Sequence, residues 1–374
     1  MRVLHIYSGN LYGGIETFLV TLARYQHLCP TLEHHFALCF DGRLSRELEE
    51  AGATVHRLGQ VQVRNPLSLW RARQKLRGIL SNKVYDVVAC HSAWPQALFG
   101  NEAGRAGLPL VFWLHNNTDG KHWLERWAAR TKPDMVLCNS EFTASTLQLI
   151  YPYTKSEIFY YPISPSKNHS EDERLTIRDE LNTPHDTTVI IQVSRMEDWK
   201  GHSLHLDALS LLHDLQTWEC WMVGGAQRPQ EEKYQNKIKS KAKLLGIADR
   251  VHFLGQRSDV PKLLAAADIH CQPNTGPEPF GITFIEGLYA GLPVVTTDMG
   301  GGREIVDSTC GVLITPKNEK ELADVLRKLI LNRELRLNLG MAGPARATQL
   351  CEPQKQMAQL GEIFMRHLLK KEAA

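Results

Sequence analysis

The stretch MRVLHIYSGNLYGGIETFLVTLARY, Met1 to Tyr25, contains a short apolar run, a loop with two glycines and an amphipathic segment. Val3 to Tyr7 has the length and composition of a buried strand, and Thr17 to Tyr25 has helical spacing. This alternation of strand-like and helical runs predicts parallel βαβ units with helices on both faces of a sheet. It continues through Phe36 to Phe40, Leu44 to Ala51, Val84 to Cys90, Leu110 to Leu114 and Met135 to Cys138.

A second alternating series follows Tyr160 to Arg174, where Pro, Ser and charged residues gather without periodicity, as in an interdomain linker. We therefore predict an α/β protein with two Rossmann-like, doubly wound domains, residues 1–165 and 166–350. The amphipathic segment Met357 to Leu369 has no strand behind it, so residues 351–374 are expected to pack back on the first domain. The strand-like runs of the second series are Val189 to Val193, Trp218 to Val223, Val251 to Leu254, Ile269 to Gln272, Val294 to Thr296 and Val312 to Ile314.

The composition is that of a soluble globular protein, with 43% apolar and 22% charged residues in 374. A formal net charge of +2 argues against a dedicated nucleic-acid binder. The eight cysteines are scattered singly, without zinc-site spacing, which favours buried thiols in a reducing compartment. The first residues are typical of a strand rather than a signal peptide, and no apolar run is long enough to span a membrane. We expect a cytoplasmic protein.

Ligands of open α/β sheets bind beyond the carboxyl ends of the strands, so the loops that follow strands are the candidate sites. Gly13 and Gly14 would let a ligand approach the amides of a helix start. Their G-x-x-x-G-G spacing lacks the second glycine of the dinucleotide fingerprint, although Asp41 stands where a ribose-binding acid is expected. A turn whose glycines only aid packing is the alternative.

The loop VSRMEDWKGH places Arg195 directly after a strand and Lys200 five residues later. A planar guanidinium and a mobile ammonium are suited to holding a diphosphate from two sides. The alternative is a solvated loop that carries two ordinary surface cations.

In PEPFGITFIEG, Pro277 to Gly287, Phe280 and Gly281 turn the chain into a helical segment, Ile282 to Gly291. The backbone amides of Gly281, Ile282 and Thr283 would then point out of a helix start and attract phosphate.

Two glutamates flank this turn. Glu286 would reach the ribose and Glu278 the opposite end of a nucleotide sugar. A hydrolase pair is disfavoured, because eight helical residues rise about 12 Å, whereas hydrolase carboxyls lie about 5 to 9.5 Å apart.

The segment EPFGITFIE resembles the E-x7-E motif of the retaining GT-B glycosyltransferases of family 4. The likeness extends over nearly the whole chain, through the N-terminal Gly-Gly, WLHNN, SRMEDWKG, MVGG, VHFLGQRSDV and GGGREIVD. It implies a GT-B fold, in which two Rossmann-like domains face one another and a C-terminal helix crosses back to the first. It also implies transfer of a hexose, with retention, from a nucleotide sugar to a hydroxyl of a glycan, a lipid or a small natural product. A UDP-sugar is favoured over a GDP-sugar.

The resemblance assigns catalytic roles to four residues. Arg195 and Lys200 would hold the diphosphate and stabilise it as leaving group, while Glu278 would touch the transferred sugar and His115 would lie beside that sugar. Where many members follow this histidine with Asp or Gly, the chain has Asn116 and Asn117. The residues that the resemblance places around the donor are Gly14, Gly224, Phe253, Arg257, Phe280, Gly281, Ile282, Thr283 and Glu286.

No D-x-D motif occurs, so cations and helix amides would supply the countercharge, without a metal or other cofactor. His34 with His35, and His202 with His205, lack a third metal ligand nearby, and we expect them on helix surfaces. Two other functions fit the same fold, a nucleotide-sugar epimerase and a nucleotide-sugar-binding protein without turnover.

The segment RNPLSLWRARQKLRGIL, Arg64 to Leu80, is a basic amphipathic helix that could lie on the anionic inner face of a membrane. The favoured interpretation is an ordinary sheet-covering helix with a solvated basic face. Trp70 and several leucines would form its apolar side, and its cations are Arg71, Arg73, Lys75 and Arg77.

Overall fold

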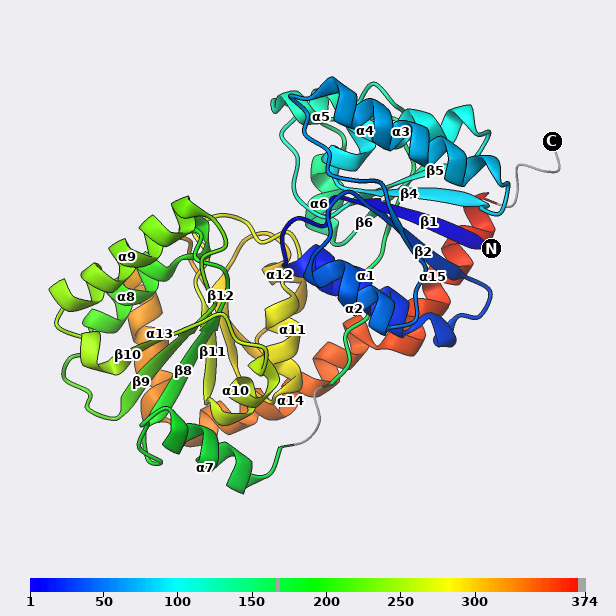
Figure 1. Cartoon of the computed structure of the whole chain (residues 1–374). Helices are drawn as coiled ribbons and strands as arrows, with labels where there is room; N and C mark the ends of the chain where they lie inside the picture. The colour runs from blue at the N-terminus through cyan, green and yellow to red at the C-terminus, as the bar shows by residue number, and fades with distance from the viewer. Residues whose placement is uncertain (166–168, 369–374) are drawn as a thin grey trace. The chain divides into compact units, whose positions relative to one another are not determined.

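The computed structural model describes residues 1–165 and 169–368, and the chain divides into two compact units (Figure 1). The first unit contains Met1–Ile163 together with the residues from Cys351 onward, and the second contains Ser164–Leu350. Each unit is built on its own parallel sheet with helices on both faces, as the alternating pattern predicts.

The sheet of the first unit has seven strands in the order β3-β2-β1-β4-β5-β6-β7, and every neighbouring pair is parallel. The order reverses between β1 and β4, which makes that junction the switch point of the sheet. The strands are β1 Arg2–Tyr7, β2 Glu33–Leu38, β3 Val55–Arg57, β4 Val87–His91, β5 Leu110–Leu114, β6 Met135–Cys138 and β7 Ser156–Ile158.

Helices α3, α4 and α5 pack together on one face of this sheet, and α1 and α2 pack together on the other (Figure 1). The unit contains α1 Gly14–Arg24, η1 Gln26–Leu28, α2 Arg43–Glu50, α3 Pro66–Ser81, α4 Ala93–Arg105, α5 Trp123–Ala128 and α6 Glu141–Leu147.

The sheet of the second unit has six parallel strands in the order β10-β9-β8-β11-β12-β13. Its switch point lies between β8 and β11. The strands are β8 Thr188–Val193, β9 Trp218–Val223, β10 Val251–Gly255, β11 Ile269–Gln272, β12 Val294–Thr297 and β13 Gly311–Ile314.

One face of this second sheet carries α8, α9 and α13, and the other carries α7, α10 and α11. The helices are α7 Glu171–Glu180, η2 Asp198–Lys200, α8 His202–Ser210, α9 Pro229–Leu244, η3 Ala248–Arg250, α10 Val260–Ala266, α11 Ile282–Tyr289, α12 Gly302–Ile305, α13 Glu319–Leu331 and α14 Arg333–Cys351.

The prediction that Tyr160 to Arg174 is entirely linker is wrong at its end, because α7 begins at Glu171. The Ser170 hydroxyl accepts a hydrogen bond from the amide of Glu173, whose carboxylate accepts one from the amide of Ser170. This reciprocal cap starts a helix within a charged segment that has no apolar periodicity. Residues 166–168 of the predicted linker lie outside the described residues.

The last helix, α15 Pro353–Leu368, belongs to the first unit, as expected from its amphipathic pattern. Gln359 donates a hydrogen bond to the carbonyl of Ile158 at the end of β7, and the His367 ring lies 2.6 Å from the carboxylate of Glu157. Leu369, the last residue of the predicted segment, lies outside the described residues.

Two strands were not predicted. Both β3 and β7 are three-residue edge strands with partial exposure, too short to show alternation. The predicted start of β4 at Val84 is also wrong, because Val84 is exposed and the strand begins at Val87. All eight cysteines are buried free thiols, as predicted. No helix among the described residues is both long enough and apolar enough to cross a membrane.

Candidate functional site

The residues predicted to bind a ligand in the second unit gather at the carboxyl end of its sheet. Arg195 and Lys200 follow β8, while Glu278 and the start of α11 follow β11, on the two sides of the switch point. In doubly wound sheets a ligand binds at this position because the loops of adjacent strands diverge there.

Lys200 and Glu278 form an ion pair across the switch point. The Lys200 Nζ lies 2.6 Å from the Glu278 Oε2, and the two side chains are only 14% and 12% exposed. The same carboxylate oxygen accepts hydrogen bonds from the side-chain amides of Gln272, at 3.1 Å, and Asn274, at 2.9 Å. All donors to this carboxylate among the described residues therefore converge on one oxygen, and Oε1 remains for another partner.

The Lys200 ammonium also lies over the ring of the neighbouring Trp199, 3.9 Å from its centroid. A cation over an indole face is attracted by the ring quadrupole. The ring and the carboxylate thus hold the ammonium in place within a loop that could otherwise expose it.

Arg195 is paired with carboxylates rather than with solvent alone. Its guanidinium lies 2.5 Å from Glu197 and 3.7 Å from Glu231 on α9, and its side chain is 31% exposed. Glu231 is itself buried. Sequence reasoning missed both acids, although Glu197 stands within the SRMEDWKG segment that was singled out.

The start of α11 depends on glycine. Gly281 precedes the helix with φ of +112°, and a Cβ at this position would lie 2.3 Å from the Phe284 ring. Phe280 is buried and anchors the turn. The helix begins at Ile282, as predicted, so the amides of Ile282 and Thr283 lie in its first turn, where helix amides lack intrahelical acceptors.

A second glycine loop closes on this turn. The Gly301 amide donates a hydrogen bond to the Glu278 carbonyl at 2.7 Å. A Cβ at Gly300 would lie 2.4 Å from the same carbonyl oxygen, and one at Gly301 would lie 2.7 Å from the Phe280 carbonyl. The glycines of GGGREIVD therefore fix the loop that carries Glu278, a role that sequence reasoning did not assign.

Glu286 is the unpaired acid of the site. It is half-buried on α11, and no described residue donates a hydrogen bond or a positive charge to its carboxylate. Burial raises the pKa of Glu286 to about 7. A ligand hydroxyl that donates to this carboxylate would favour its ionised form.

Two further glycines bring the loops of the sheet together. A Cβ at Gly201 would lie 1.8 Å from the Pro273 carbonyl oxygen, and one at Gly224 would lie 1.9 Å from the Ser194 carbonyl oxygen. Close packing of backbones therefore requires Gly224 here, whether or not a donor phosphate also approaches it.

The segment from Phe253 to Arg257 ends β10 and begins the next loop. The Gly255 carbonyl accepts a hydrogen bond from the Gly224 amide at 2.8 Å, which brings this loop beside the end of β9. Arg257 makes two hydrogen bonds to Asp259, at 2.8 and 2.6 Å. Phe253 is partly buried.

Gly14 and His115 belong to the first unit, whereas the other predicted site residues belong to the second. Gly14 is the first residue of α1, and Gly13 before it donates its amide to the buried carboxylate of Glu16 at 2.9 Å. The same carboxylate accepts the hydroxyl of Tyr7 at 2.7 Å. The loop is thus a capped helix start.

His115 follows β5 and is buried, with 3% exposure. Its Nε2 lies 2.8 Å from His91 Nδ1, and its Nδ1 lies 2.5 Å from the Tyr161 hydroxyl. Burial lowers the pKa of His115 to about 3, so the ring is neutral at physiological pH. Both ring nitrogens are engaged within the unit.

The expectation that His34, His35, His202 and His205 lie on helix surfaces is wrong. His34 and His35 are on β2, and His34, His202 and His205 are buried. No group of three or more possible ligand residues that could hold a metal ion occurs among the described residues.

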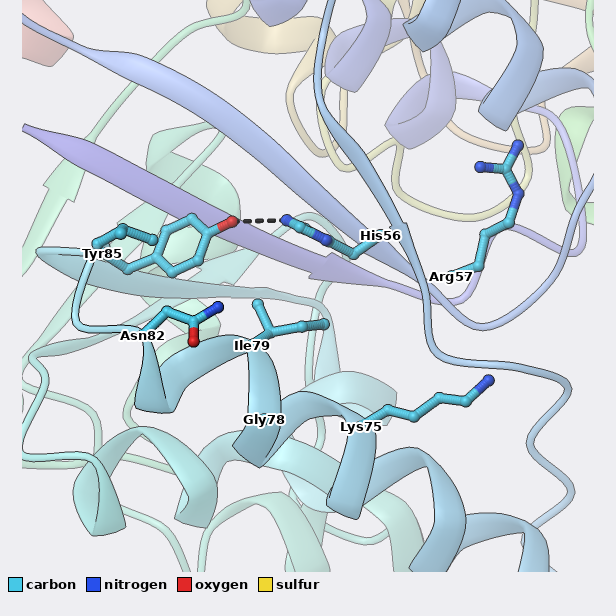
Figure 2. A pocket seen from close by; sticks show the side chains of 8 residues that line it. His56, Arg57, Lys75, Gly78, Ile79, Asn82 and Tyr85 are labelled. Atoms are coloured by element: carbon cyan, nitrogen blue, oxygen red, sulfur yellow. Dashed lines mark hydrogen bonds between the residues drawn. The ribbon is translucent and has the colours of Figure 1, made fainter.

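A hollow of about 440 Å³ lies at the β3 edge of the first sheet, and none of the predicted site residues lines it (Figure 2). Its lining includes the Tyr85 hydroxyl, 2.6 Å from His56 Nε2, and the cationic side chains of Arg57 and Lys75. Arg57 is already paired with Asp41 and Glu49, so its charge is compensated within the unit. The pairing also takes up Asp41, the residue considered for ribose binding.

Comparison with known proteins assigns the family. The model described as Glycosyltransferase Family 4 matches residues 12–166, and the model described as Glycosyl transferases group 1 matches residues 173–346. The chain belongs to glycosyltransferase family 4. The second match contains all the predicted site residues of the second unit.

Curated relatives of this family 4 chain include two bacterial enzymes. The lipopolysaccharide glucosyltransferase WaaG of Escherichia coli is 33% identical over 181 residues, which are 47% of this chain and 46% of the relative. The phosphatidyl-myo-inositol mannosyltransferase of Mycobacterium leprae is 36% identical over 151 residues, 39% of this chain and 38% of the relative. Each match therefore spans less than half of the relative.

The fold of the family 4 chain is GT-B. The crystal structure of Anabaena HepE in complex with UDP-glucose superposes with a TM-score of 0.87 and 24% sequence identity, covering 98% of this chain and 100% of that one. The crystal structure of WaaG gives a TM-score of 0.73 at 20% identity over 97% and 99% of the two chains.

Proposed function

We propose that this chain transfers a hexose, with retention of configuration, from a UDP-sugar to a hydroxyl acceptor, without a metal. The observation that carries this proposal is the Lys200–Glu278 ion pair at the switch point, beside Arg195 and the amides of α11. Two cations and the amides of a helix start provide three contacts for a diphosphate.

The site residues have separate tasks in this proposal. Lys200 and Arg195 neutralise the charge that develops on the leaving diphosphate, with the helix amides as further donors. Glu278 keeps Oε1 for a hydroxyl of the transferred sugar, while Oε2 holds Lys200. Glu286 accepts hydrogen bonds from the ribose hydroxyls. The leaving phosphate oxygen takes the acceptor proton on the same face, which accounts for retention without a protein base.

The nucleotide and the acceptor are inferred from relatives. HepE, which shares the fold, was crystallised with UDP-glucose, and this supports a UDP-sugar donor. Two relatives are named for lipopolysaccharide and phosphatidyl-myo-inositol, both of which contain lipid. We therefore propose a lipid-linked or glycan acceptor before a small natural product.

Helix α3 is the proposed contact with an anionic inner membrane face. Its cations are divided, because Arg73 donates to the Leu98 carbonyl and Arg77 pairs with Glu102, both on α4. The exposed side instead carries Arg71 and, next to it in sequence, Trp70, a residue that is 56% exposed. This side combines an interfacial aromatic with positive charge.

Co-sedimentation with vesicles of anionic lipid tests this contact. The double substitution Trp70→Ala with Arg71→Ala should reduce the bound fraction, whereas Arg77→Ala, which removes the same charge from the α4 side, should have a smaller effect. Equal losses in the two variants, or no vesicle binding by the wild type, would contradict the proposal.

Incubation with UDP-glucose, UDP-N-acetylglucosamine and GDP-mannose tests the activity itself. Slow release of free nucleotide, unchanged by a chelator, supports a metal-independent transferase. A 2-epimer of the sugar as product would instead identify an epimerase. Tight binding without either product would identify a binding protein.

A further inference from the structure

Four buried histidines form one continuous hydrogen-bonded row across the sheet of the first unit. His34 Nδ1 lies 2.9 Å from His5 Nε2, His5 Nδ1 lies 2.8 Å from His91 Nε2, and His91 Nδ1 lies 2.8 Å from His115 Nε2. We call His34, His5, His91 and His115 the histidine row. Its last member, His115, is bonded through Nδ1 to the Tyr161 hydroxyl.

The register of the sheet produces this row. His34 is paired with Val3, two residues before His5; His5 is paired with Ala89, two residues before His91; and His91 is paired with Trp113, two residues before His115. Side chains two residues apart lie on the same face of a strand. The rings therefore climb diagonally across β2, β1, β4 and the end of β5, with successive centroids 5.1 Å apart.

The rings are neutral and closed off from solvent. His5, His34 and His91 are at most 1% exposed and His115 is 3% exposed. Phe18 of α1 covers the His115 end, 5.6 Å from that ring and 4.4 Å from the ring of Tyr161. Burial lowers the pKa of every ring in the row. Each neutral imidazole carries one N–H donor and one bare acceptor nitrogen.

Every contact in the row joins an Nδ1 to the Nε2 of the next ring. If one ring is protonated at Nδ1, its neighbours must be as well, because a mixed row would bring two N–H groups or two bare nitrogens together. Only two arrangements satisfy all contacts, with all four protons on Nδ1 or all four on Nε2.

The end of the row distinguishes these two arrangements. His34 Nε2 is buried and has no hydrogen-bond partner among the described residues. With all protons on Nε2, this atom would be a buried N–H without an acceptor, the rarer of the two defects in folded proteins. With all protons on Nδ1, it is only a bare nitrogen, and His115 donates to Tyr161.

We propose that the histidine row is locked in one shared tautomer, with each proton on Nδ1, so that His5, His34 and His91 act as positioning residues for His115. The histidine row fixes His115 as a donor to Tyr161. It also connects His115, which directly precedes Asn116 and Asn117, through hydrogen bonds to His34 on β2. The consequence for turnover rests on the proposed transferase function, whereas the shared tautomer does not.

Long-range proton–nitrogen correlation spectra of the full chain, labelled with ring-15N histidine, test the tautomers directly. Protonated and bare ring nitrogens resonate far apart, and each ring is assigned by its loss in a single Gln variant, which keeps one donor and one acceptor for the neighbouring rings. We expect four rings protonated at Nδ1 alone near neutral pH. Any of them protonated at Nε2, or at both nitrogens, would overturn the proposal.

Two substitutions at the middle of the row test the coupling. His91→Phe removes the acceptor of His5, so His5 and His34 should populate both tautomers. His91→Gln restores one acceptor and one donor at the same place, so His5 and His34 should both keep their proton on Nδ1. The control His35→Phe, on the same strand but bonded to Tyr85 and Glu33, should leave the row unchanged. Retention of Nδ1 by both rings in His91→Phe would show independent tautomers and overturn the coupling.

Turnover provides a second readout. We expect kcat for UDP-sugar to fall about 10- to 100-fold in His91→Phe, as for other partners that orient a functional histidine. The KM for the donor should stay unchanged, and His91→Gln should recover most of kcat. Equal kcat in all variants would overturn the positioning role. A wild-type protein without turnover would instead refute the proposed function, and the spectral test would still decide the tautomers.

Discussion

The two sheets have the same doubly wound order around their switch points, yet the polar groups there differ in kind. In the second unit, charged groups meet beyond β8 and β11, where Lys200 contacts Glu278 and Arg195 contacts Glu197. In the first unit, neutral imidazoles of β1 and β4, His5 and His91, contact each other inside the sheet. The difference separates a site that can exchange its partners for a ligand from a network whose partners are internal.

Exposure is the physical basis of this difference. The paired cations of the second unit remain partly exposed, and Glu286 has no partner among the described residues. A ligand can therefore replace contacts there without opening the core. In the first unit the four rings are buried, so a ligand that took their hydrogen bonds would leave buried nitrogens unpaired. The charged site is suited to binding and the neutral row to positioning.

The largest effect is expected from a substitution that removes a cation from the charged site of the second unit. Lys200→Ala should lower kcat about 100- to 1000-fold, because one preorganised electrostatic contact to the leaving diphosphate is lost. The measurement is the rate of nucleotide release from a UDP-sugar, with the melting temperature recorded on the same sample. Lys241→Ala is the matched control, since Lys241 pairs with Asp207 on α8, outside the predicted site residues. Similar losses in the two variants would refute the assignment.

The next largest effect is expected on stability, from a substitution at a glycine of the loop that carries Lys200. Gly201→Ala should destabilise the second unit by more than about 3 kcal/mol, because Gly201 has φ of +77° and its new Cβ would lie 1.8 Å from the Pro273 carbonyl. Gly246→Ala, at φ of +69° with nothing within 4 Å of the new Cβ, should cost only about 1 kcal/mol. Urea unfolding of both variants checks the difference, and equal costs would show that the close approach is unimportant.

The histidine row should make the stability of the protein depend on pH. Burial lowers the pKa of His34 to about 4. The unfolded chain therefore gains this proton first as the pH falls below about 6.5, and stability is lost from there down to the folded pKa. Because of this ring, the free energy of unfolding should be about 2 kcal/mol lower at pH 5 than at pH 7. His34→Phe should remove that increment, measured as the difference between urea unfolding at pH 7 and at pH 5. An unchanged pH dependence would show that His34 is not held neutral by burial.

The smallest effect concerns Glu286. Because its pKa is raised to about 7, the carboxylate is mostly neutral at pH 6 and mostly ionised at pH 8. If the ionised form binds the ribose, UDP should bind up to about tenfold more weakly at pH 6 than at pH 8. Titration calorimetry measures both affinities, after correction for ionisation of the nucleotide with Glu286→Gln as reference. A variant with the same pH dependence as the wild type would place the ribose elsewhere.

Much of the fold could be predicted because it follows from the local periodicity of apolar residues along the sequence. Four buried strands, β5, β6, β9 and β11, have the predicted bounds to the residue, since buried parallel strands are short apolar runs between turn signals. The start of α11 after Gly281 was predicted for a similar local reason, because glycine permits the positive φ. The edge strands β3 and β7 were not predicted because three partly exposed residues are too few to show an alternation of apolar and polar residues.

The sequence by itself determined the two-unit α/β architecture, the glycine corners and the candidate charges of the second unit. Only the tertiary structure decided the partners of those residues. Lys200 and Glu278 are 78 positions apart, and the histidine row unites four residues spread between positions 5 and 115. These contacts depend on which strands lie side by side and in what register. Strand order and register are set by the packing of the whole sheet, which no short segment specifies.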